Sequence, residues 1–254
     1  MKVSIITVTY NARRFIEGAI HSVLSQTYPD IEYIIVDGAS TDGTMGIVDH
    51  YRDRIARIVS EPDHGVFDAM NKAIALSTGE VLFFLGADDW LFDQDVIKDV
   101  VRAFEVKGAD IVHGMVRYVN VPVSYQGTIL GEYKGNHPMP TGYHIIRYLL
   151  CHQACFCKKH LFDRYGIFDI SYKIHSDFNW LLKAISSGAR MEYIDRDVVC
   201  FNVTGISSNL FGAFLEHSRS IFKWYGFRGI VCHVFWRSVN VLLFISGKFK
   251  RSTA

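Results

Sequence analysis

The sequence has few cysteines, few prolines and almost no net charge, and these shortages exclude several classes of protein. Its 254 residues contain five cysteines and five prolines. The cysteines are odd in number and lack paired C-x-x-C spacing, which excludes a zinc ribbon and a secreted disulfide scaffold. The N-terminal apolar run Val3–Val8 is short and interrupted by Ser4 and Thr7, so it is no signal peptide. We therefore expect a cytoplasmic protein with reduced thiols.

The net charge of +1 conceals an uneven distribution along the chain. Residues 217–254 contain seven Lys or Arg and no Asp or Glu, so the first 216 residues hold 20 basic against 26 acidic side chains. An acidic body therefore carries a basic tail. The body has no basic face studded with aromatic residues, and we expect no nucleic-acid partner.

The most informative stretch is the apolar run Val81–Leu85, which is followed by the adjacent acids Asp88 and Asp89. A continuous apolar run of this length predicts a strand covered on both faces. Open α/β sheets bind their ligands beyond the carboxyl ends of such strands. Paired Asp oxygens there suit a hard divalent cation that also carries phosphates. The alternative is that one of the two acids caps a following helix.

Strands and helices are predicted to alternate through the first 85 residues. The predicted strands are residues 3–9, 31–37, 55–60 and 81–85, and the predicted helices are residues 12–25, 44–54 and 66–76. This alternation predicts an α/β fold with a parallel sheet and right-handed crossovers. Asp37, Asp63 and the pair Asp88–Asp89 each follow a strand, so we expect them at one polar edge of the sheet.

Several segments of this half resemble the nucleotide-sugar half of the family 2 inverting glycosyltransferases, in the family's order and at its usual spacings. They are Thr7–Asn11, Ser25–Tyr28, Val36–Thr44 and the Asp88–Asp89 pair. The resemblance implies the GT-A fold, with a Rossmann-like, mostly parallel central sheet flanked by helices. It implies a nucleotide-sugar half at residues 1–120 and, in the same domain, an acceptor and catalytic-base half at residues 121–216.

The resemblance also implies donor contacts. The residues implied to hold the uracil and ribose are Thr7, Thr9, Tyr10 and Asp37. Gly38 stands where many members carry a second acid, so that acid's uracil contact falls to Asp37 or Asp63. A subgroup pattern matches Glu61–Lys72 and makes Asp68 and Lys72 further donor contacts, with a solvated helix face as the alternative.

The remaining implied roles concern the metal, the base and the acceptor. Asp89 matches the acid that binds Mg²⁺ or Mn²⁺ at the diphosphate, and Asp88 the acid that contacts the sugar or ribose. Asp177 matches the catalytic base, and the alternative is an acid placed at a helix N-terminus for its dipole. His152 and Gln153 resemble an acceptor-side segment within a predicted strand at residues 151–157, where the alternative is a histidine satisfied by hydrogen bonds.

Two loops complete the implied site. Residues 122–142 are rich in Gly and Pro and are expected to border the acceptor. Residues 202–208 resemble a small-residue loop that lies over the active site in relatives and could exclude water.

The implied activity is metal-dependent transfer of a sugar from a UDP-sugar to a saccharide acceptor with inversion. The donor is expected to carry Gal, Glc, GlcNAc or GalNAc, and the product is a β-glycoside. The acceptor is expected to be a lipid-diphosphate-linked intermediate of a bacterial surface polysaccharide such as O-antigen or colanic acid. The alternatives are a sugar-nucleotide nucleotidyltransferase, whose Gly-rich loop is missing after the first strand, and a non-catalytic nucleotide- or glycan-binding protein.

The basic tail, residues 217–254, is predicted to be an amphipathic helix. Its apolar run 230–245 carries one narrow polar stripe of His233, Arg237 and Asn240, and burying Arg237 disfavours a membrane-spanning helix. We expect a helix lying at the inner face of the cell membrane, with basic residues drawn to anionic lipid. The aromatic residues expected to face lipid are Phe222, Trp224, Tyr225, Phe227, Phe235 and Trp236. The alternative is a helix packed on the body or on a second copy of the chain.

Overall fold

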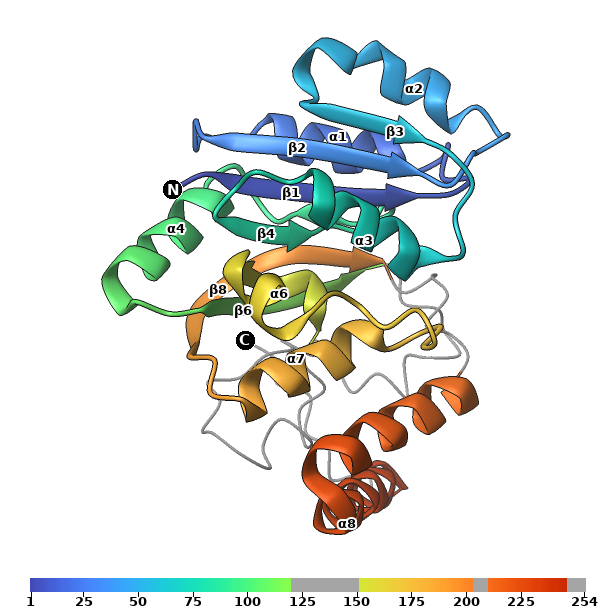
Figure 1. The fold of residues 1–254 in the computed structure, drawn as a ribbon, viewed down its shortest axis with the longest axis vertical. Coiled ribbons are helices and arrows are strands. Elements are labelled where there is room, and N and C mark those ends of the chain that lie inside the picture. Colours follow the sequence, from blue (N-terminus) through green and yellow to red (C-terminus); the bar gives the residue numbers. More distant parts are fainter. Residues whose placement is uncertain (120–150, 203–209, 246–254) are drawn as a thin grey trace.

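One mixed sheet organises the chain, and its strand order is β3-β2-β1-β4-β7-β6-β8-β5 (Figure 1). The computed structural model describes residues 1–119, 151–202 and 210–245. The strands are β1 (Val3–Thr9), β2 (Ile31–Asp37), β3 (Arg57–Ser60), β4 (Val81–Phe84), β5 (Trp90–Leu91), β6 (Ile111–Val119), β7 (Cys155–Lys158) and β8 (Met191–Asn202).

The first four strands are parallel and adjacent, as the sequence predicts. Thr9 pairs with Asp37 and Asp37 with Ser60, so the carboxyl ends of β1, β2 and β3 lie in register. Strand β4 joins the other side of β1, with Ile6 opposite Phe84. Asp37 and the segments that follow β1, β3 and β4 are thereby brought to the same edge. The second half is mixed: β7 is antiparallel to both β4 and β6, whereas β6 and β8 are parallel.

Helices cover both faces of the sheet. They are α1 (Ile16–Leu24), α2 (Thr44–His50), α3 (Val66–Leu76), α4 (Val96–Lys107), α6 (His160–Tyr165), α7 (Ser176–Ser186) and α8 (Leu210–Ile245), with 3-10 turns η1 (Arg52–Arg54) and η3 (His152–Ala154). Helix α1 begins at Ile16, later than predicted, and the amides of Ala12 and Arg13 in the turn ahead of it donate to side chains of Thr44 and Asp42.

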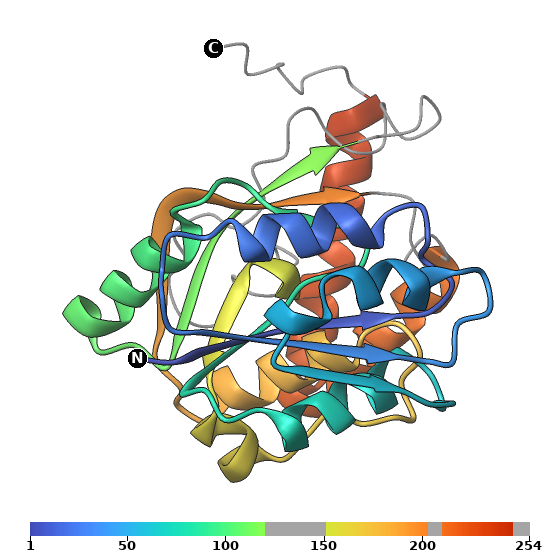
Figure 2. The same cartoon turned by 90° about the horizontal axis from the view of Figure 1, so that it is seen from above.

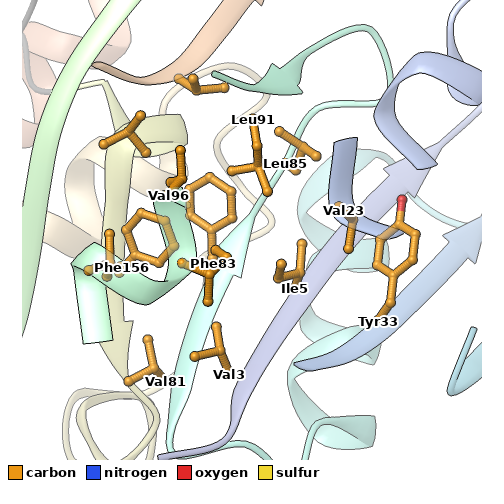
Figure 3. Packing of buried hydrophobic residues seen from close by; sticks show 14 of the residues in the cluster. Val3, Ile5, Val23, Tyr33, Val81, Phe83, Leu85, Leu91, Val96 and Phe156 are labelled. Atoms are coloured by element: carbon orange, nitrogen blue, oxygen red, sulfur yellow. The ribbon is translucent and has the colours of Figure 1, made fainter. Parts of the chain in front are cut away.

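Alternate residues of each strand fill two cores. On one face Ile5 and Phe83 pack with α1 and α4, and Phe83 stacks on Phe156 with ring centroids 4.0 Å apart (Figure 3). On the other face Ile6 packs with α3, α6 and α7, where Trp180 stacks on a ring from α6. Successive side chains of β1 thus point to opposite faces of the sheet, and both faces are buried, as expected for a central strand.

Helix α8 packs against α7 on the side of α7 that lies away from the sheet (Figure 1), and Figure 2 shows the same elements from above. Ile221 of α8 is fully buried with Phe178 and Leu182 of α7, and Trp224 packs against this cluster. Gly226 adopts φ +64° and breaks the regular helical backbone at that point. The predicted tail boundary at residue 217 therefore falls inside a helix that packs on the body.

Several sequence-based expectations differ from the structure or lie beyond it. Residues 151–157 are not one strand, because His152–Ala154 form a 3-10 turn ahead of β7. Trp224 and Tyr225 are partly buried against the cluster that joins α8 to α7, a contact that the sequence-based expectation did not include. The expected loops 122–142 and 203–208 lie outside the described residues, as do the side chains of His233, Arg237 and Asn240 and of Phe235 and Trp236.

Candidate active site

Asp37 ends β2 as a fully buried carboxylate that holds the loop after it. Its Oδ2 accepts hydrogen bonds from the Ser40 amide at 2.9 Å and the Ser60 hydroxyl at 2.7 Å, and its Oδ1 accepts one from the Ser40 hydroxyl. Hydrogen bonds to a charged acceptor are strong, so these contacts tie the loop after β2 to the end of β3. Asp37 therefore lies at the carboxyl edge of the sheet, as expected, and holds the backbone there in place.

Tyr10, Gly38 and Asp63 converge at the ends of β1, β2 and β3. A Cβ added to Gly38 would lie 2.5 Å from Asp63 Oδ2 and 3.3 Å from Tyr10 Cδ2. The space that a second acid after Asp37 would need is thus taken by the carboxylate of Asp63. Asp63 Oδ1 accepts the Gly65 amide at 2.8 Å, and Tyr10 is 67% exposed. An exposed aromatic ring beside a carboxylate suits contact with a flat, hydrogen-bonding base.

The two threonines of β1 lie deeper than Tyr10. Thr7 is fully buried, and its hydroxyl accepts a hydrogen bond of 3.1 Å from Tyr33, so this side chain supports the strand. Thr9 is also buried, and its hydroxyl has no hydrogen-bond partner within the described part of the chain. Of the two, Thr9 lies nearer to the polar edge.

Asp68 and Lys72 of α3 hold the loop that follows β3. Asp68 accepts the His64 amide at 3.0 Å, while Lys72 Nζ lies 2.8 Å from a Glu61 carboxylate oxygen and 3.0 Å from the Pro62 carbonyl. The negatively charged Asp68 is also 3.5 Å from Lys72. Both side chains thus position the loop that carries Asp63.

The Asp88–Asp89 pair lies in the turn between β4 and β5. Asp89 is 1% exposed, and its Oδ1 accepts the backbone amide of Asn202, the last residue of β8, at 2.8 Å. A Cβ added to Gly86 would lie 2.4 Å from Asp89 Oδ2 and 3.3 Å from Asp88 Oδ1, so glycine leaves the room that the Asp89 carboxylate occupies. Burial raises the pKa of both, and that of Asp89 to about 7, because desolvation disfavours the charged form.

These two carboxylates fit a divalent cation. Asp89 Oδ2 is buried and has no hydrogen-bond partner among the described residues, and a buried anionic oxygen left unpaired is costly unless a cation compensates it. Residues 1–119, 151–202 and 210–245 contain no group of three or more His, Cys, Asp or Glu that could hold a metal ion. Such a cation would therefore need most of its ligands from phosphates and water, which is an ordinary shell for Mg²⁺.

Asp177 lies in the first turn of α7 and contacts His152 of η3. Its Oδ2 pairs with His152 Nδ1, while its Oδ1 is buried with no hydrogen-bond partner in the described segments. Burial by itself would raise the pKa of Asp177, but the charges of His152 and His175 and the bond to His152 outweigh it and lower that pKa. The carboxylate is thus ionised at neutral pH.

His152 links the two acidic groups. Burial would lower its pKa, but the carboxylates of Asp177 and Asp89 raise it, so the imidazolium is favoured. Its neighbour Gln153 accepts a hydrogen bond of 2.9 Å from Cys151 Sγ. The expected pair His152–Gln153 therefore lies at the acidic centre, with His152 directly on the expected base.

Helix α8 fixes the segment ahead of Asp177. The carboxylate of Glu216 accepts the backbone amides of Lys173, Ile174 and His175 at 2.8 to 2.9 Å. Trp224 Nε1 donates to Asn179 Oδ1 at 2.9 Å, which ties the same helix to α7. Glu216 is not among the residues predicted from the sequence, where its only signal is its position immediately before the basic tail.

Together these groups form a site with two chemical ends. One end holds the ionised carboxylate of Asp177, one oxygen of which has no hydrogen-bond partner among the described residues. The other end presents Asp89, which suits a cation that neutralises a leaving group. The charges of Asp177 and Asp89 both act on His152 and raise its pKa.

Comparison with known proteins identifies similar sequences along most of the chain. The model of the family described as glycosyl transferase family 2 matches residues 4–161. A PGL/p-HBAD biosynthesis glycosyltransferase of Mycobacterium bovis is 30% identical over 214 residues, covering 81% of this chain and 78% of that protein. The putative teichuronic acid biosynthesis glycosyltransferase TuaG of Bacillus subtilis is 45% identical over 96 residues, 36% of this chain and 38% of its own.

Solved structures share the fold. S. aureus TarS residues 1–349 in complex with UDP-GlcNAc superimposes with a TM-score of 0.71 at 20% identity, covering 93% of this chain and 72% of that one. The mannosyltransferase PcManGT of Pyrobaculum calidifontis in complex with GDP-Man and Mn²⁺ gives 0.65 at 17% identity, covering 97% and 79%. At these identities the likeness establishes a GT-A type of fold.

Proposed function

Because the chain belongs to glycosyl transferase family 2, we propose that it transfers a sugar from a UDP-sugar to a saccharide hydroxyl with inversion at the anomeric carbon. The observation that carries this proposal is the pair of buried acids, Asp89 and Asp177. Each has one carboxylate oxygen without a hydrogen-bond partner in the described residues. One oxygen suits a cation at the diphosphate, and the other suits a proton from the acceptor.

The nucleoside of the donor contacts Tyr10 and Asp63, which lie beside Gly38. Asp63 accepts the ring N–H of uracil in place of the second acid that Gly38 lacks, since its carboxylate already occupies that space. Tyr10 offers its exposed ring to the base, and the buried Asp37 keeps the loop closed beneath the ribose. Asp68 and Lys72 act on the donor through the loop they hold, and Asp88 lies next to the sugar.

Replacing Asp63 with asparagine is expected to raise the KM for the UDP-sugar and leave kcat nearly unchanged. A hydrogen bond to a charged group contributes about 1.5 to 3 kcal/mol, so the rise is roughly 10- to 100-fold. UDP release measured against donor concentration checks this. The matched control is Asp53→Asn, which neutralises an exposed acid on η1. An unchanged KM in Asp63→Asn would show that uracil is read elsewhere.

Asp89, aided by Asp88, would hold Mn²⁺ or Mg²⁺ at the donor diphosphate. Bound there, the cation supplies positive charge that stabilises the departing UDP. The chain's own contribution is to keep Asp89 buried and fixed by the Asn202 amide, so that an unpaired oxygen is presented without reorganisation.

Asp177 removes the proton of the acceptor hydroxyl as the oxygen attacks the anomeric carbon. The bond from that carbon to the diphosphate oxygen breaks on the opposite side, and UDP leaves with the bonding electrons. The proton stays on Asp177 until it passes to solvent. An α-linked donor therefore gives a β-glycoside by a single displacement.

The acceptor is a saccharide of a bacterial surface polysaccharide, carried on a lipid diphosphate. The names of two relatives, which concern PGL/p-HBAD and teichuronic acid biosynthesis, support a cell-surface glycoconjugate.

The test of the activity is UDP release from UDP-Gal, UDP-Glc, UDP-GlcNAc and UDP-GalNAc, with and without Mn²⁺, in the presence of saccharide acceptors. Absence of UDP release from every donor would contradict the proposed function.

The outer surface of α8 lies on the inner face of the cell membrane. Phe222 and Phe227 are 60% and 74% exposed, and the exposed cations Arg219, Lys223 and Arg228 accompany them. Exposed aromatic and basic side chains together suit an interface with anionic lipid. Within the described residues, no helix is long and apolar enough to cross a membrane. A second copy of the chain covering this surface is the alternative.

We expect the double variant Phe222→Ser and Phe227→Ser to bind anionic liposomes more weakly while retaining donor hydrolysis. Two large apolar side chains contribute several kcal/mol when buried in lipid, so affinity should fall by at least about tenfold. The control, Val106→Ser with Ile167→Ser, removes two exposed apolar side chains elsewhere. A truncation that tests the same role should delete only residues 231–254. A truncation after Arg219 would also remove Ile221, which is buried against α7. Equal liposome binding by wild type and both double variants would contradict the membrane role.

A further inference from the structure

The two oxygens of Asp177 have different surroundings. The residue is 7% exposed, so its carboxylate depends on protein contacts for its orientation. Oδ2 is bonded to His152 Nδ1, whereas Oδ1 is buried and makes no hydrogen bond to any residue that the structure describes. A carboxylate held by one oxygen keeps the other at a fixed place, which is what a base needs.

His152 is itself well fixed. It begins the 3-10 turn η3, in which the Ala154 amide donates to the Cys151 carbonyl at 3.1 Å, directly before β7 enters the sheet. Its side chain is only 19% exposed, so most of the ring is covered by protein. The imidazole therefore leaves only a small part of its surface open.

Four ionisable side chains share this centre. Asp177 is influenced by His152 and His175, and His152 by Asp177 and Asp89. His175 stacks on His217 of α8 with ring centroids 3.8 Å apart, so it belongs to the packing around α7. His152, by contrast, is bonded to the base directly, which distinguishes it from the other charges nearby.

We propose that His152 is a positioning residue whose Nδ1–H holds Asp177 Oδ2, so that Asp177 Oδ1 is the atom that takes the acceptor proton. This inference rests on the proposed function, because it assumes that Asp177 is the base. The proton moves from the acceptor oxygen to Oδ1 while His152 keeps its own protons. The bond to Oδ2 then orients the carboxylate through the whole displacement.

The experiment compares His152→Ala, His152→Asn and His152→Gln in the full chain. An Asn amide nitrogen lies two bonds from Cβ, as Nδ1 does, so it can donate to Oδ2, whereas the Gln nitrogen lies farther out and mimics Nε2. The readouts are kcat, donor KM and the pH profile of kcat from UDP release. The control is His160→Ala, which breaks a surface contact of 3.7 Å between His160 and Asp110.

We expect His152→Ala to lower kcat by roughly 10- to 100-fold at unchanged donor KM, which is the loss typical of a residue that orients another. His152→Asn should recover most of that loss, and His152→Gln should not. The acid limb of the pH profile should move to higher pH in His152→Ala, because a buried carboxylate without its positive partner is protonated more easily. A role in packing alone would not produce this order of variants.

Two results would overturn the inference while leaving the proposed function intact. One is an active wild type in which Asp177→Asn is inactive but His152→Ala keeps full kcat and the wild-type pH profile. The other is recovery by His152→Gln rather than His152→Asn, which would place the role of His152 at Nε2. If His152→Ala is unfolded by thermal melting, the comparison of Asn with Gln decides. Failure of the wild type to release UDP from any donor would instead contradict the proposed function itself.

Discussion

Replacing Asp177 with asparagine is expected to lower kcat by roughly 10² to 10⁴, the range typical for loss of a general base. The substitution keeps the size of the side chain and its place in the first turn of α7, so the fold and the affinity for UDP should change little. The amide can still accept a hydrogen bond from His152 through its oxygen. What it loses is the negatively charged oxygen that we propose takes the acceptor proton.

The measurement is steady-state UDP release in the presence of an acceptor, together with UDP affinity by calorimetry. Asp163→Asn is the matched control, because Asp163 is an exposed acid on α6, away from the polar edge. Transfer by Asp177→Asn at nearly the wild-type rate, with wild-type UDP affinity, would show that another group is the base.

Asp89→Asn is expected to abolish transfer, with a loss of roughly 10³-fold or more, since a cation contributes several kcal/mol to stabilising a leaving group. The variant keeps an oxygen for the Asn202 amide and fits the space beside Gly86, so folding should be retained. A neutral amide binds a divalent cation far more weakly than a carboxylate does. Chelation of divalent cations in the wild type should reproduce the defect.

Added Mn²⁺ should restore the chelated wild type and leave Asp89→Asn inactive. This difference separates loss of the cation from loss of its protein ligand. Asp163→Asn again serves as the control and should depend on Mn²⁺ as the wild type does. Undiminished transfer in excess chelator would contradict the assignment of Asp89 to a metal.

The sequence predicts the first half of the fold well because local pattern and tertiary role agree there. Strand β2 and helix α3 have the predicted bounds, and Asp37 and Ser60 meet at the edge because parallel strands end together. Apolar runs and period-3.6 helices carry this information locally. The adjacency of Asp63 and Gly38 also follows from neighbouring strand ends, although the sequence does not reveal that one fills the space of the other.

The second half could not be predicted in the same way, because its contacts join segments far apart in the chain. His152 reaches Asp177 across 25 positions, and Glu216 reaches the amide of Lys173 across 43. Antiparallel β7 separates β4 from β6, and no local pattern specifies that order. A 3-10 turn at His152–Ala154 stands where a strand was expected. This turn contacts α7, which is distant in the sequence.

The C-terminal helix shows why an amphipathic pattern is ambiguous. Trp224 and Phe222 are both aromatic and lie two positions apart, yet one donates to Asn179 and the other is exposed. An apolar stripe facing protein and one facing lipid have the same composition. Only the packing against α7 distinguishes them, so the proposed membrane contact is confined to the outward side of α8.

The most direct test of the account is the anomeric configuration of the transfer product. The wild type is incubated with an α-linked UDP-sugar, Mn²⁺ and a saccharide acceptor, and the new linkage is assigned from the anomeric proton coupling in the NMR spectrum. A single displacement with Asp177 as base predicts a β-glycoside. An α-glycoside would contradict it, because retention requires either a second displacement or attack from the side on which UDP departs.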